Sequence, residues 1–246
     1  MNELESTISQ IIEENFLPYE WNENIEKELK DLSLNTELNR KDLTQIPFVT
    51  IDGADAKDFD DAVFCNLNDK TFILDVAIAD VAEIVKLDSA LNKEAMQRGT
   101  SIYFPSKVIP MLPEKISNNL CSLVPNEVRN VLICEMIFSL SGEMKSYKFF
   151  EARIKSHKRM TYNEVEDFIK NQKLNASKSI KNSLGSLNIL TKSLLVKRNK
   201  RQALEIDSQE PILNINKNGK VEQISLPQRL YAHQMIEESM LAANVC

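Results

Sequence analysis

The chain has 246 residues and a formal net charge of −6, with 43% hydrophobic and 27% charged residues, which is ordinary for a globular protein of one large or two small domains. No apolar stretch approaches the roughly 18 residues that cross a bilayer, and the acidic N-terminus lacks the order of a signal peptide, so we expect a cytoplasmic protein without a membrane partner. With two histidines and no Cys-x-x-Cys pair, the sequence argues against a zinc site and a disulfide framework. We expect free, mostly buried thiols and no disulfide-linked partner for the four cysteines, Cys65, Cys121, Cys134 and Cys246.

The first half of the chain predicts two helices followed by strands. Helical spacing with many Glu and Lys over residues 3–16 and 22–33 indicates a surface lead-in, which we assign to residues 1–40, before a separate domain over residues 41–246. Asp88 or Ser89 is placed to cap a helix that runs to residue 98, whereas residues 103–128 contain four prolines and are expected to be irregular. Alternation of apolar residues predicts strands over residues 46–51, 62–65 and 71–78.

The second half predicts two hairpins and three helices. The hairpins turn at Ser141-Gly142 and around Asn218-Gly219. Their strands are expected over residues 131–140, 145–155, 212–215 and 221–224, and the helices over residues 162–171, 178–201 and 226–246. Because strands and helices are interleaved, the predicted class is α/β or α+β, with a mixed sheet and surrounding helices.

Charge is distributed unevenly along the chain. Residues 1–61 carry 16 acidic and 5 basic residues, whereas residues 145–201 carry 15 basic and 4 acidic residues. This asymmetry is suited to an acidic metal site beside a cationic track for phosphates. The alternative for the basic segment is a solvated helix face.

Five aspartates lie within ten residues, at the junction between two predicted strands. They are Asp52, Asp55, Asp58, Asp60 and Asp61. Carboxylates this close repel each other unless a cation is present, and hard oxygen ligands suit Mg²⁺ or Mn²⁺. The spacing does not match a calcium loop, and an acidic surface turn without a ligand is the remaining alternative.

Further blocks follow the aspartates in a fixed order. The chain reads Thr50-Ile-Asp-Gly-Ala-Asp-Ala-Lys-Asp-Phe-Asp-Asp-Ala-Val63, then Val76-Ala-Ile-Ala-Asp-Val81, Arg98-Gly-Thr-Ser-Ile-Tyr-Phe-Pro105, Ile109-Pro-Met-Leu-Pro-Glu114, Leu120-Cys-Ser-Leu123, Met160-Thr-Tyr162 and Ala232-His-Gln-Met-Ile-Glu-Glu-Ser-Met-Leu-Ala-Ala-Asn244. From about residue 40 onward, this series resembles the RNB catalytic domain of the RNase II / RNase R family, and it is closer to the RNase R branch.

The resemblance implies an activity and a set of catalytic residues. Members of the family are processive, Mg²⁺-dependent 3′→5′ exoribonucleases that degrade single-stranded RNA to nucleoside 5′-monophosphates. Their four catalytic aspartates correspond to Asp52, Asp58, Asp60 and Asp61. By this resemblance Asp52 and Asp61 are metal ligands, Asp60 holds the catalytic ion or orients water, and Asp58 supports the site. Asp55 is outside the family's set.

The resemblance also implies RNA contacts. Tyr103 corresponds to a tyrosine that stacks on a base, which suits an enzyme indifferent to sequence, and Tyr162 to one near the terminal nucleotide. Glu237 corresponds to a glutamate near the same nucleotide, with Glu238 as a one-residue alternative. The alternatives are a core position for Tyr103 and helix-surface charge for both glutamates. We place Lys155, Lys158 and Arg159 beside the RNA, and expect a packed or hydrogen-bonded His233 and a solvent-facing His157.

The expected departures from the family pattern lie at the two ends. Complete members carry two cold-shock OB domains before the catalytic domain and an S1 domain after it. The later part of their catalytic domain contains an arginine that contacts the region of the scissile phosphate. We expect all of these parts to belong to a full-length protein. The alternative function is therefore a truncated, catalytically incomplete RNA-binding or partner-binding remnant.

Overall fold

The computed structural model describes residues 3–34, 39–203, 211–216, 219–226 and 228–246. The chain forms two compact units, each built from separate stretches of sequence. The larger unit comprises residues 34–81, 116–204 and 229–246, and the smaller unit comprises residues 1–33, 82–115 and 205–228. The sequence predicted one domain boundary, at residue 40, whereas each of these units comprises three separate stretches of the chain. The boundary at residue 40 stays a prediction.

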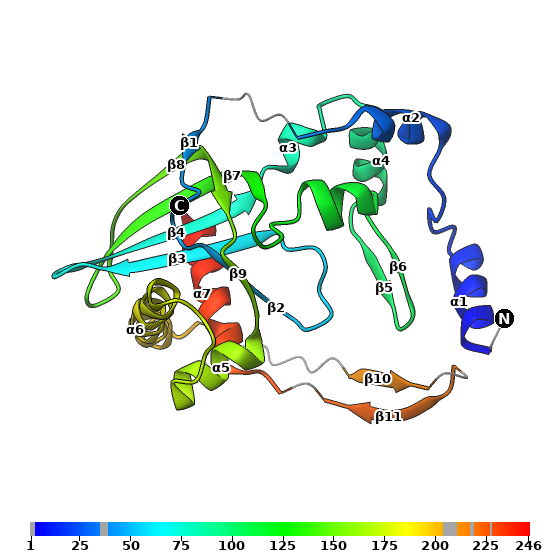
Figure 1. Ribbon diagram of the computed structural model, residues 1–246. Coiled ribbons are helices and arrows are strands. Elements are labelled where there is room, and N and C mark those ends of the chain that lie inside the picture. Colours follow the sequence, from blue (N-terminus) through cyan, green and yellow to red (C-terminus); the bar gives the residue numbers. More distant parts are fainter. Residues whose placement is uncertain (1–2, 35–38, 204–210, 217–218, 227) are drawn as a thin grey trace. The chain divides into compact units, whose positions relative to one another are not determined.

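A seven-stranded mixed sheet is the frame of the larger unit (Figure 1). Its order is β1-β8-β7-β4-β3-β2-β9, in which the β1–β8 and β2–β9 pairs are parallel and the others antiparallel. The strands are β1 (Lys41–Asp42), β2 (Val49–Asp52), β3 (Asp61–Leu67), β4 (Thr71–Ala79), β7 (Val128–Ser139), β8 (Met144–Lys155) and β9 (Lys158–Thr161). β2 therefore lies between β3 and β9, and both of these neighbours carry candidate site residues.

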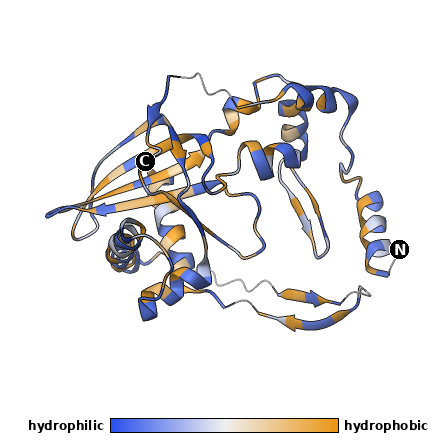
Figure 2. Ribbon diagram, viewed as in Figure 1, coloured by the Kyte–Doolittle hydropathy of each residue, from blue (hydrophilic) through white to orange (hydrophobic). Residues whose placement is uncertain are grey.

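Three helices bury one face of this sheet. They are α5 (Tyr162–Asn171), α6 (Lys178–Lys200) and α7 (Tyr231–Val245). Apolar side chains from all three join those of the central strands in one core, which includes Val76, Met136, Phe168, Leu187 and Met235. The apolar stretches of the central strands stand out in Figure 2. This burial fixes the strand register, because a slip of one residue would turn the apolar set to the opposite face.

The smaller unit contains mostly short elements. They are α1 (Glu3–Glu14), α2 (Glu23–Asp31), α4 (Ala90–Arg98), β5 (Ile102–Phe104), β6 (Lys107–Ile109), β10 (Ile212–Ile215) and β11 (Val221–Ser225), and α3 (Val81–Ile84) begins at the boundary between the units. Glu28 of α2 accepts hydrogen bonds from the Ala90 and Leu91 amides at the start of α4, at 2.7 and 3.0 Å. A carboxylate there satisfies amides that have no partner within the helix. No helix in the described ranges is long and apolar enough to cross a membrane.

The mixed fold class and most elements are confirmed, with two corrections. Residues 103–128 are not wholly irregular, because β5 and β6 pair as a hairpin and residues Ile116–Leu120 form a π-helical turn. The two lead-in helices are not purely surface elements, since Ile8, Ile12 and Ile25 are buried. The high glutamate content of both helices indicated exposure, although one or two apolar positions on each are enough to form a buried face. Asn218 of the predicted second turn lies outside the described residues.

Candidate active site

The acidic run connects two neighbouring strands of the sheet. Asp52 ends β2, residues 53–60 form a loop, and Asp61 begins β3. Because β2 and β3 run antiparallel, with Val49 opposite Val63, the two ends of the loop meet at one edge of the sheet. The Ala79 amide donates to the Asp60 carbonyl at 2.9 Å, which ties the end of the loop to β4. The fold therefore brings together the two ends of the run, as its position between predicted strands suggested.

The aspartates of this edge disfavour each other's ionisation. Burial first, and then the charges of Asp58 and Asp60, raise the pKa of Asp52 to about 6. Burial and the charges of Asp52 and Asp60 raise the pKa of Asp61 to about 7, and burial followed by the charge of Asp58 raises the pKa of Asp60. Positive charge nearby would relieve this repulsion, and the Arg159 guanidinium already acts on Asp52 in that direction.

The donor set fits a hard divalent cation in its chemistry. Its oxygens are carboxylates whose mutual repulsion a Mg²⁺-type ion would offset. Among the residues that the structure describes, however, no group of three or more His, Cys, Asp or Glu side chains is arranged to hold a metal ion. The predicted ligands Asp52, Asp60 and Asp61 therefore remain candidates on electrostatic grounds.

Ser122 holds the second half of the acidic loop from outside it. Its hydroxyl accepts from the Phe59 amide at 3.0 Å and donates to the Lys57 carbonyl at 2.9 Å, and the Leu123 amide donates to the Phe59 carbonyl at 2.8 Å. These bonds flank Asp58. The sequence alone gave Ser122 no role, because a buried serine in a proline-rich stretch has no distinguishing spacing.

Tyr162 lies close to the acidic edge. It begins α5 directly after β9, and Thr161 caps that helix in a reciprocal pair with Glu164. Burial and the charges of Asp52 and Asp61 raise the pKa of the Tyr162 phenol to about 12. Its ring stacks on His233 with the ring centroids 3.9 Å apart. The His233 Nδ1 accepts from the Leu230 amide at 3.0 Å, so the expected packed, hydrogen-bonded histidine is confirmed.

Comparison with known proteins identifies the family. The RNB domain model matches residues 40–246. The chain belongs to the RNB domain family. Ribonuclease R of Vibrio parahaemolyticus is 44% identical to this RNB domain over 236 residues, covering 93% of the chain and 28% of that protein. Two structures of Mycoplasma genitalium RNase R, one in complex with ribose methylated single-stranded RNA and one with double-stranded RNA, both match with a TM-score of 0.92. Their sequences are 35% and 34% identical to this chain. Each match covers 97% of this chain, and covers 38% and 43% of the two RNase R chains respectively. The chain thus spans less than a third of the curated relative.

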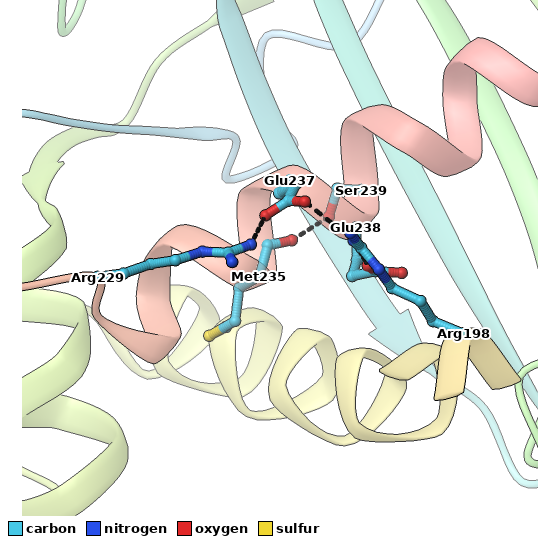
Figure 3. A network of polar contacts seen from close by, with 6 residues as sticks. All are labelled: Arg198, Arg229, Met235, Glu237, Glu238 and Ser239. Atoms are coloured by element: carbon cyan, nitrogen blue, oxygen red, sulfur yellow. Dashed lines mark hydrogen bonds and ion pairs between the residues drawn. The ribbon is translucent and has the colours of Figure 1, made fainter. Parts of the chain in front are cut away.

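Two arginines outside α7 hold Glu237 and Glu238, which lie on that helix of the RNB domain (Figure 3). Arg198, at the end of α6, donates to Glu237 at 2.9 Å and to Glu238 at 2.7 Å, and Arg229, just before α7, also pairs with Glu237. Glu238 is 5% exposed, so it is not helix-surface charge. Glu237 is only partly buried, and each of its carboxylate oxygens already accepts from an arginine. The ion pair with Arg198 therefore links this glutamate to α6, and the pair with Arg229 links it to the segment that leads into α7.

The other predicted contacts are spread over both units. Lys155 ends β8, and the Lys158 ammonium donates to the Asn175 carbonyl. The solvent-facing prediction for His157 is wrong, because its ring Nε2 hydrogen bonds with the Thr44 carbonyl at 3.0 Å and the residue is half-buried. Tyr103 belongs to the smaller unit, where it is 70% exposed on β5 and therefore not a core residue.

The expectation of mostly buried thiols is confirmed. None of the four cysteines takes part in a disulfide within the described residues, and Cys65, Cys121 and Cys134 are buried. Burial raises the pKa of the Cys65 and Cys134 thiols, so neither is activated as a nucleophile.

Proposed function

We propose that this RNB domain carries the catalytic site of a 3′→5′ exoribonuclease that hydrolyses single-stranded RNA processively to nucleoside 5′-monophosphates. The observation that carries the proposal is the convergence of Asp52, Asp60 and Asp61 at one edge of the sheet, where burial and the charges of neighbouring aspartates, Asp58 included, raise the pKa of all three. Perturbed carboxylates gathered at one place are typical of a functional site. We assign the chain to the cytoplasm.

Asp52, Asp60 and Asp61 would hold the metal, Mg²⁺ by preference and Mn²⁺ as a substitute. When bound, such an ion lowers the pKa of water and offsets negative charge at the phosphorus. Asp58 supports the site through its charge on Asp52 and Asp60. The proposed role of Asp60 is to hold the catalytic ion or to orient the attacking water.

The proposed reaction releases one nucleotide at a time. Water adds to the phosphorus of the last phosphodiester, the bond from phosphorus to the 3′ oxygen breaks, and that oxygen leaves protonated as the new RNA end. Tyr162 would contact the terminal nucleotide, and the effect of the Asp52 and Asp61 charges on the pKa of its phenol supports this role. Glu237 retains acceptor capacity for a ribose hydroxyl beyond its two arginine bonds. Tyr103 stacks on a base, and Lys155 and Lys158 lie along the backbone.

The relatives support RNA as the substrate. Mycoplasma genitalium RNase R forms complexes with ribose methylated single-stranded RNA and with double-stranded RNA. This chain spans 28% of the length of the Vibrio relative, so we propose the activity of the whole ribonuclease for this chain on the strength of its aspartate site.

The test is to incubate the chain with Mg²⁺ and a short single-stranded RNA that carries a 5′ label, and then to separate the products. The proposal predicts RNA that shortens from its 3′ end and nucleoside 5′-monophosphates as the product. A 3′-phosphate product, internal cuts, or undiminished activity in excess EDTA would contradict it.

The second candidate function is RNA binding without hydrolysis. It is favoured by the basic residues of the 145–201 segment and by the lack, in the described part, of a preformed group of three metal ligands. It predicts RNA binding that weakens with salt by a slope of about 0.7 for each phosphate contacted, and no shortening of the RNA.

A further inference from the structure

In the part of the chain that the structure describes, the Arg159 side chain is hydrogen-bonded to the first half of the acidic loop. Its Nη2 donates to two consecutive carbonyls, those of Gly53 and Ala54, each at 2.7 Å. These are the two residues that follow Asp52. A guanidinium nitrogen carries two hydrogens in one plane, so a single nitrogen satisfies both acceptors. Arg159 therefore fixes the direction in which the chain leaves β2.

The fold explains how Arg159 reaches this position. β9 runs parallel to β2, and Arg159 lies beside Thr50, two residues before Asp52. The side chain thus extends forward over the end of the neighbouring strand. Tyr162 follows three residues later at the start of α5. One short segment therefore provides both the support of the loop and the tyrosine nearest the aspartates.

Arg159 also joins the two halves of the loop. Its guanidinium carbon lies 5.6 Å from the centroid of the Phe59 ring, which is 7% exposed. The backbone of Phe59 is in turn held by Ser122 and Leu123. Arg159 as a whole is partly buried, and among the described residues its Nε is buried without a hydrogen-bond partner. The loop carbonyls and the Phe59 ring are therefore the neighbours that the structure gives this guanidinium.

We propose that Arg159 is a positioning residue that fixes the acidic loop between Asp52 and Asp60, and that it is not a direct RNA contact. This replaces the role in RNA binding that the basic composition of its segment suggested. The inference rests on the proposed function for its consequences in catalysis, whereas the support of the loop itself is testable without RNA.

Hydrogen exchange of the RNA-free chain tests the support directly. The Ala56 amide donates to the Gly53 carbonyl, one of the two that Arg159 holds, whereas the Leu123 amide donates to Phe59 in the Ser122 region. In Arg159→Met we expect the Ala56 amide to exchange about tenfold faster and the Leu123 amide to stay within about twofold of wild type. Arg159→Lys keeps the positive charge and hydrogen-bond donors, so we expect an exchange rate of the Ala56 amide between those of wild type and Arg159→Met. This variant replaces Arg159→Met in the experiment if the methionine variant does not fold.

Kinetics and RNA affinity separate positioning from contact. We expect Arg159→Met to lower kcat by about 100-fold with little change in KM, since a misplaced catalytic group costs rate. We expect an unchanged dependence of RNA affinity on salt. Lys145→Met is the matched control, because it removes an exposed charge of the same basic segment that pairs with Glu143.

Two results would overturn the inference. One is an unchanged Ala56 exchange rate in both Arg159 variants, which would show that the loop does not depend on this side chain. The other is weaker RNA binding with a salt slope reduced by about 0.7, which would make Arg159 a phosphate contact. If wild type fails to shorten RNA, the proposed function fails, but the exchange experiment still decides whether Arg159 fixes the loop.

Discussion

Replacing Asp61 by asparagine should make the folded chain more stable in the absence of divalent cations. Burial and the charges of Asp52 and Asp60 raise the pKa of Asp61 from 3.8 to about 7. A carboxyl whose pKa is raised on folding binds its proton more tightly in the folded state. Its contribution to stability is therefore complete below about pH 4 and is lost as the pH rises towards 7. Asparagine has the same shape and no charge, so it avoids this loss.

The size of the effect follows from the same pKa values. Each pKa unit corresponds to about 1.4 kcal/mol, so full ionisation of Asp61 costs about 4 kcal/mol, and solvent screening reduces the expected gain to about 2–4 kcal/mol. Urea denaturation of wild type and Asp61→Asn in EDTA at pH 4 and pH 8 measures it. We expect the variant to be more stable at pH 8 and nearly equal to wild type at pH 4.

Asp55→Asn is the matched control for this experiment. Asp55 lies in the same loop but is not among the charges that raise the pKa of Asp52, Asp60 or Asp61. We expect its removal to change stability by less than about 0.5 kcal/mol, as for most surface positions. An Asp61→Asn variant that gains nothing over Asp55→Asn at pH 8, or that gains equally at both pH values, would refute the electrostatic reasoning.

Two further substitutions test the contacts around the site. Arg198→Met leaves the buried Glu238 carboxylate without the arginine that pairs with it, so we expect the free energy of unfolding in urea to fall by about 3 kcal/mol. Lys145→Met, at an exposed ion pair, should lower it by less than about 1 kcal/mol. Equal losses in the two variants would mean that the Arg198 ion pairs do not support the fold. Ser122→Ala removes the partner of the Phe59 amide and the Lys57 carbonyl, so we expect a loss of about 1–2 kcal/mol and faster exchange of the Phe59 amide, and an unchanged exchange rate would argue against this support of the loop.

The sequence predicted what depends on short-range pattern. Alternation gave β3 and β4, and the acidic run between apolar segments placed Asp52 and Asp61 at strand ends. The ordered blocks predicted the family, which the RNB match confirms. The strands and the acidic run are local features, whereas the family was predicted from the order of blocks along most of the chain.

The contacts that hold the site could not be predicted in the same way. Ser122 and Arg159 act on the loop from 63 and 106 positions away in sequence, and only the sheet order brings them there. Composition made Arg159 one cation in a basic segment, whereas its position beside β2 gives it specific acceptors. The same holds for Arg198, to which the sequence analysis gave no role and which the structure pairs with two glutamates of α7.

Comparison of Asp60→Asn with Asp55→Asn in the RNA degradation assay with Mg²⁺ tests the central claim most directly. Both substitutions remove one negative charge from the same loop, so they share any general effect on RNA affinity. The proposed site predicts that Asp60→Asn lowers the rate of 3′ shortening by about 100-fold or more, whereas Asp55→Asn stays close to wild type. Equal rates for the two variants would contradict the assignment of catalysis to these aspartates.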